Sequence, residues 1–198
     1  MSSRKASTPS SQASHFSEEF KLLDKSSLLK FVAWSIYPFV LGKSINQFIE
    51  DQYRSGSKLL QEIILDIFQG RHDKGSAERA KSLLADIEWD VDDVDEDDFD
   101  ASEGALKFLG ATEMVIDFVL KGGRKNAVNS AIQFLEQIDY YMMNYDEEDM
   151  KYKNANIFLE EEFALQRHVL QDFKEAKSRD ISIDYKRENI VQKISSLH

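Results

Sequence analysis

The 198-residue sequence contains no cysteine, only two prolines and only eight glycines. The absence of cysteine excludes a disulfide scaffold, a thiolate metal site and a cysteine nucleophile. So few prolines and glycines cannot supply the many turns of an all-β fold. No run of about 18 apolar residues occurs, so we expect no transmembrane helix and no membrane partner. With no apolar secretory segment either, we expect a cytoplasmic protein.

Positive charge is scarce as well. Lysine and arginine total 25 against 36 acidic residues, and the net charge is −11. Because there is no basic excess to neutralise phosphates, we expect no direct binding to nucleic acid. No glutamate lies three residues before any of the four histidines, which excludes the usual helical di-metal pattern. We therefore expect no metal and no cofactor, and the sequence contains no catalytic signature.

Helical periodicity is the dominant pattern in the sequence. Residues 57–69 place apolar side chains at steps of three and four, which is typical of an amphipathic helix, and Gly70 ends it. Pro38 lacks a backbone N–H, so we expect a helix break before it and a new helix from Pro38 to about Tyr53. The other predicted helices cover about 18–25, Ser26 or Ser27 to Trp34, Ser76 to Ile87, Asp100 or Ser102 to Gly122, 126–143, 156–177 and 180–196.

These segments predict an all-α fold, a single-domain bundle of about seven to nine helices joined by short loops. Residues 1–17 are rich in serine, contain one proline and lack an apolar run. They are expected to form a disordered leader. The domain itself is expected to cover residues 18–198.

One window concentrates the negative charge. Residues 86–100 hold ten acids and no base, so the rest of the chain sums to −1. Such a window is either a solvated loop, a docking surface for a basic partner, or a cation site. An EF-hand loop needs glycine at position six, and this window has aspartate there. The docking surface would comprise Asp90, Asp92, Asp93, Asp95, Glu96, Asp97 and Asp98, with Trp89 and Phe99 as apolar anchors.

Two other functions stay open. A pocket between helices could serve a small-ligand or metal-binding enzyme, and its polar groups would be Glu161, Glu162, Arg167 and His168. Alternatively, Trp34, Tyr37 and Phe39 could meet a second copy in a homodimer. We favour a non-enzymatic interaction protein that docks a basic protein partner by electrostatic steering.

The order of several short stretches resembles the bacterial domain of unknown function 416 family. The first stretch is Leu29 to Ala33 leading into Tyr37-Pro38, followed by Phe48 and the Ile63–Ile67 stripe. The second is Asp97 to Asp100 before a helix from Ala105 to Gly122. The third comprises Asn154-Ala155, Glu161 to Gln166 and Arg179 to Ile181. The likeness covers about residues 20–196. It implies an all-α fold and a bacterial protein with no assigned function, and it carries over no catalytic residues.

Overall fold

The computed structural model describes residues 8–87, 89, 94–146, 148–175 and 181–195. The described residues form an all-α bundle with nine α-helices, as the sequence predicts. The α-helices are α1 (Pro9–Glu19), α2 (Lys25–Leu41), α3 (Lys43–Gln52), α4 (Gly56–Phe68), α5 (Lys74–Leu84), α6 (Phe99–Lys121), α7 (Arg124–Met143), α8 (Met150–Lys174) and α9 (Ile190–Ser195). Two 3₁₀ turns, η1 (Phe20–Leu22) and η3 (Glu96–Asp98), lead into α2 and α6.

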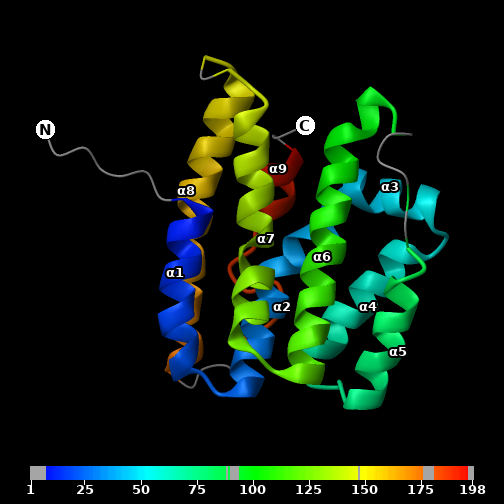
Figure 1. Ribbon diagram of the computed structural model, residues 1–198. Helices are drawn as coiled ribbons and strands as arrows, with labels where there is room; N and C mark the ends of the chain where they lie inside the picture. The colour runs from blue at the N-terminus through cyan, green and yellow to red at the C-terminus, as the bar shows by residue number, and fades with distance from the viewer. Residues whose placement is uncertain (1–7, 88, 90–93, 147, 176–180, 196–198) are drawn as a thin grey trace, which may run out of the picture.

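Helix α2 lies at the centre of the bundle (Figure 1). It packs against α3, α4, α6, α7, α8 and α9. Its side chains Phe31, Trp34 and Phe39 are fully buried. Phe39 stacks on Phe108 of α6 and meets Phe134 of α7 edge-on. The core is therefore built around α2, with the longer helices α6, α7 and α8 beside it.

The expected helix break before Pro38 is wrong. Helix α2 runs through Pro38 to Leu41, and the chain bends by 81° into α3 at Gly42 instead. The Nδ2 atom of Asn46 donates to the carbonyls of Phe39, Val40 and Gly42, at 2.9, 3.1 and 2.6 Å. Burial on several sides stabilises α2 enough to tolerate the missing proline N–H, and the amide of Asn46 satisfies carbonyls at its end.

The expected disordered leader is wrong for residues 9–17, which form most of α1, while residues 1–7 lie outside the described residues. Thr8 caps the helix in a reciprocal pair with Ser11. Phe16 is fully buried and stacks on Phe20, with 5.0 Å between ring centroids. Gln12 is also buried and accepts a hydrogen bond from Arg167. The serines of this segment occupy the cap and the solvent face, so composition alone concealed the helix.

Several helix boundaries differ from the predictions. Helix α5 begins at Lys74 because Asp73 and Ser76 form a reciprocal cap, and α8 begins at Met150 after the cap Asp149. The predicted final helix over 180–196 is reduced to α9, and residues 181–189 contain turns. The predicted end at Gly122 and Gly123 is confirmed, and both have positive φ, at 74° and 87°.

In the described residues, no single helix is long and apolar enough to cross a membrane. The bent pair α2 and α3 passes that test together, by length and composition. Most side chains of α2 are buried in the core of the bundle.

Candidate functional site

The acidic segment lies at one end of the bundle, where α6 begins (Figure 1). Glu96–Asp98 form η3, and Asp98 occupies the N-cap position of α6 without a capping hydrogen bond from its side chain. Asp95, Glu96, Asp97 and Asp98 are all exposed. Within the described part of the chain, none of these four carboxylates forms an ion pair. Asp90, Asp92 and Asp93 lie outside the described residues.

Trp89 is not an exposed docking anchor, contrary to the expectation. Its ring is half-buried and meets Phe48 of α3 edge-on, with 5.1 Å between centroids. Its indole Nε1 donates to the Oγ atom of Ser102, a fully buried residue of α6, at 3.1 Å. Trp89 therefore fastens the acidic segment to α3 and α6. Phe99, by contrast, is 43% exposed and stays available as an apolar contact.

A second acidic loop lies at the same end of the molecule. The turn between α7 and α8 presents Asp146, Glu148 and Asp149, all exposed, and Figure 1 shows this turn at the same end of the bundle as the start of α6. The hydroxyl of Tyr145 donates to the Oδ2 atom of Asp100 at 3.4 Å, which joins the two segments. Helices α6 and α7 follow each other and pack as antiparallel neighbours, so the start of one lies beside the end of the other.

We call this surface the acidic end and define it by the exposed carboxylates of Asp95, Glu96, Asp97, Asp98, Asp146, Glu148 and Asp149. From the sequence, only the first run of acids was predicted to be a docking surface. The second could have been found from the expectation of two consecutive antiparallel helices, since that topology brings both loops together. Two bases lie near this surface. The ammonium of Lys151 lies 4.9 Å from the centroid of the Tyr145 ring, and that of Lys153 donates to the backbone carbonyl of Glu148 at 2.9 Å.

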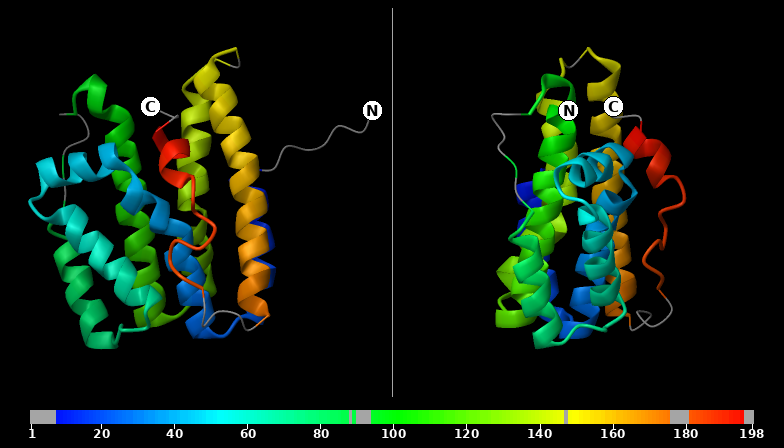
Figure 2. Two further views of the ribbon diagram at one scale, coloured as in Figure 1. Left: turned by 180° about the vertical axis from the view of Figure 1, so that it is seen from behind. Right: turned by 90° about the vertical axis from the view of Figure 1, so that its right-hand side faces the viewer.

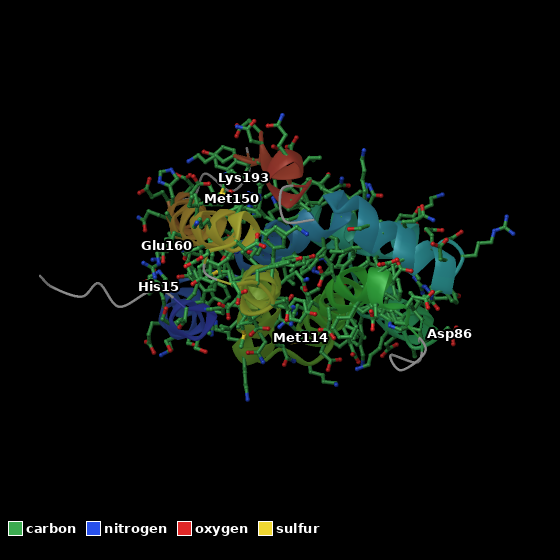
Figure 3. The ribbon with its side chains drawn as sticks, turned by 90° about the horizontal axis from the view of Figure 1, so that it is seen from above. His15, Asp86, Met114, Met150, Glu160 and Lys193 are labelled. Atoms are coloured by element: carbon green, nitrogen blue, oxygen red, sulfur yellow. The ribbon has the colours of Figure 1, made fainter. Side chains whose placement is uncertain are left out.

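Exposed methionines accompany these acids. Met143, the last residue of α7, is 81% exposed, and Met150, the first residue of α8, is 66% exposed. Figure 3 views the bundle from this end and labels Met150 on α8. Methionine side chains are flexible and polarisable, and they adapt to differently shaped partners. Together with Phe99, they give the acidic end an apolar component.

The structure does not bring the four predicted pocket residues together. Glu162 is buried and pairs with Arg187 at 2.5 Å, whereas Glu161 lies on the surface and pairs with Lys193. Arg167 donates through Nε to Gln12 of α1. His168 is exposed, and its Nε2 atom lies 3.6 Å from the carboxylate of Asp172. The four side chains therefore contact four different partners and share no cavity.

The proposed dimer contacts are also used within the chain. Trp34 and Phe39 are fully buried, and Tyr37 is half-buried. Among the residues that the structure describes, no three histidine, aspartate or glutamate side chains gather in a way that could hold a metal ion. No family model, no curated protein and no solved structure matches this chain. The resemblance to the domain of unknown function 416 family stays a prediction.

Proposed function

We propose that this chain is a non-enzymatic interaction protein that docks a basic protein partner on its acidic end. The observation that carries the proposal is the presence of two exposed acidic loops at one end of the molecule, whose described carboxylates form no ion pair with any base that the structure describes. A dense patch of one charge attracts oppositely charged partners over about a Debye length and accelerates their encounter. The same patch repels phosphate, which argues against a nucleic acid as the partner.

The exposed apolar side chains of the acidic end indicate that the partner carries apolar residues as well as positive charge. Phe99, Met143 and Met150 lie on or next to the two acidic loops. Charged contacts at an interface supply rate and register, whereas buried apolar contacts supply most of the affinity. The partner that fits is therefore a lysine- or arginine-rich segment that also carries large apolar residues, such as a basic amphipathic helix.

A charge-neutralised variant tests this function. The variant changes Asp95, Asp97 and Asp98 to asparagine and Glu96 to glutamine. The matched control changes four exposed glutamates elsewhere to glutamine, and these are Glu18, Glu62, Glu78 and Glu160. Both variants lose four charges, and in both the changed side chains are exposed, so we expect both to keep the melting temperature of the parent within a few degrees.

Binding is measured by fluorescence anisotropy with a labelled basic amphipathic peptide of about 20 residues. We expect binding to the parent protein to weaken at least tenfold between about 50 and 500 mM salt. The neutralised variant should lose at least about tenfold in affinity at low salt, and the control variant should bind like the parent. Equal binding by the two variants would show that the acidic loops are merely solvated.

A further inference from the structure

One cationic side chain in the core has an unused hydrogen-bonding edge. Arg187 belongs to the C-terminal segment, residues 181–195, and is only 4% exposed. Its Nη1 atom donates to Glu162 at 2.5 Å. Its Nε and Nη2 atoms are buried and have no hydrogen-bond partner among the described residues. These two nitrogens form one side of the guanidinium, where two parallel N–H groups match the two oxygens of a carboxylate.

The surroundings hold this arginine in one orientation. Its guanidinium lies 3.9 Å from the centroid of the Trp34 ring. The other oxygen of Glu162 accepts a hydrogen bond from Gln166, so both oxygens of that carboxylate are occupied. The indole of Trp34 donates to the carbonyl of Tyr185 at 2.9 Å, which fixes the segment next to Arg187. The Arg187 side chain is therefore held in one rotamer, and its unpaired edge is preorganised.

Arg187 lines a groove of about 480 Å³ between the C-terminal segment and α2. Figure 2 shows this segment crossing the back of the bundle in front of α2. The apolar part of the lining comes from Tyr37, Leu41 and Val191. The exposed carboxylates of Asp184 and Glu188 line the same groove. Lys186 also lines the groove, so its wall combines charged side chains of both signs with apolar ones, which can orient a small ligand and also pack against it.

We propose that this groove binds an α-amino acid with an apolar side chain. Its carboxylate is held by the Nε and Nη2 atoms of Arg187, and its ammonium is held by Asp184 and Glu188. Lys186 and Arg187 on this groove balance the charges of Asp184 and Glu188, so a phosphate or any other dianion would leave it with an unbalanced negative charge. A zwitterion carries a carboxylate that pairs with the cationic edge and an ammonium that pairs with the acidic residues. Its apolar side chain packs on Leu41 and Val191. Because the Nε and Nη2 atoms of Arg187 are buried, the ligand reaches them only by displacing part of residues 181–189, which contain turns and no α-helix.

The two tryptophans provide a spectroscopic test, since the chain has only Trp34 and Trp89. In protein labelled with ¹⁵N at the indole nitrogens, each gives one side-chain signal, assigned with Trp89→Phe. Titration with L-leucine at constant ionic strength should shift the Trp34 signal saturably. The Trp89 signal should not move, because that ring contacts Phe48 and Ser102 instead. Absence of a saturable shift at Trp34 overturns the proposal.

Two analogues separate the contributions of the ligand's charges. L-leucinamide lacks the carboxylate and N-acetyl-L-leucine lacks the ammonium, and we expect each to bind at least about tenfold more weakly than L-leucine. If L-leucinamide binds as well as L-leucine, the role of the Arg187 edge is wrong. If N-acetyl-L-leucine binds as well as L-leucine, the ligand is a simple carboxylate, and Asp184 and Glu188 do not bind an ammonium.

Two variants complete the test. Arg187→Lys keeps a cation beside Glu162 but removes the two-nitrogen edge, and it should weaken L-leucine binding at least about tenfold. Arg167→Lys, on the exposed side of α8, is the matched control and should bind like the parent. Glu188→Gln is exposed and leaves the core intact, so it stays informative even if Arg187→Lys folds poorly. It should weaken L-leucine but not N-acetyl-L-leucine, and unchanged binding of L-leucine contradicts a role for Glu188.

Discussion

Two glycines of α6 differ in what a side chain at their position would meet. A Cβ atom at Gly104 would lie 2.5 Å from Cδ1 and 2.7 Å from Cγ1 of Ile45, whereas Gly110 has nothing within 4 Å. We expect Gly104→Ala to destabilise the protein by about 1–3 kcal/mol through overpacking against α3. Gly110→Ala should stabilise it by up to about 1 kcal/mol, because alanine favours the helix. Urea unfolding measures both free energies.

A double variant identifies the cause at Gly104. If Ile45 is the obstacle, Gly104→Ala combined with Ile45→Ala should be less destabilised than the sum of the two single variants. If the free-energy changes of the two single variants simply add, Ile45 is not the obstacle to a side chain at position 104. Gly110→Ala with Ile45→Ala serves as the additive control.

The buried pair of Glu162 and Arg187 gives a second prediction. Both side chains are 1% exposed, so removing one partner leaves an uncompensated charge in the core. We expect Glu162→Gln to lower the free energy of unfolding by about 3–5 kcal/mol. Glu161→Gln, which breaks the exposed pair with Lys193, should cost less than about 1 kcal/mol. Urea titrations of the two neighbouring variants test this difference, and equal losses would contradict it.

The sequence marks such residues as candidates but cannot name their partners. Glu162 was singled out from its polar neighbours on one helix, yet its partner lies 25 residues away, in a segment predicted to be helical. Trp89 was interpreted from its acidic neighbours, whereas its position follows from Phe48 and Ser102, on two other helices. Both misassignments arise because tertiary contacts, which neighbouring residues do not encode, decide which side of a chain is buried.

At the scale of elements, one carboxylate makes two of the contacts that hold the C-terminal segment against α8. Asp172 of α8 accepts hydrogen bonds from Lys186 at 3.0 Å and from the hydroxyl of Tyr185 at 3.3 Å. Burial raises the pKa of Asp172, but Lys186, the nearby His168 and the Tyr185 hydroxyl lower it more, so the pKa lies below its ordinary value. A carboxyl with a depressed pKa stabilises the fold above its unfolded pKa, and this stabilisation is lost as the pH falls through the folded pKa.

We therefore expect acid to loosen residues 181–189. Stability measured by urea unfolding between about pH 6 and pH 2 should fall less steeply in Asp172→Asn than in the parent, because the variant lacks this titration. The two curves should converge below the depressed pKa. Parallel curves across the whole range would show that Asp172 does not titrate in contact with Lys186.

Helices with a strong periodic pattern were predictable, and those without one were not. The stripe over 57–69 corresponds to α4, and the pattern over 126–143 falls within α7. Helix α1 was missed because one buried aromatic residue, Phe16, and a buried glutamine stabilise an otherwise serine-rich segment. Pro38 was given too much weight, since the local cost of a missing N–H is smaller than the packing energy of a central helix.

At the scale of the whole molecule, topology produces the candidate site. The acidic end consists of residues 95–98 and of 146, 148 and 149, which are some 50 positions apart and are exposed at one end because α6 and α7 are antiparallel. The fold class followed from composition and periodicity. Assigning the second acidic loop to the site needs the arrangement of α6 and α7. The sequence predicts that arrangement once the two consecutive helices are taken as antiparallel neighbours in a bundle.

The central position of α2 gives a last prediction, on the distribution of stability. Helix α2 packs against six other helices, whereas the main contacts of α5 are with α6 alone. Amides that exchange only through global unfolding belong to the best-packed elements, and elements at the edge open locally. In native-state hydrogen exchange, the α2 amides should therefore report the free energy of global unfolding, with the full dependence on denaturant. The α5 amides should exchange at a lower free energy with a weaker dependence. If α5 is as protected as α2, the bundle unfolds as one unit and its edge gains stability from contacts other than packing on α6.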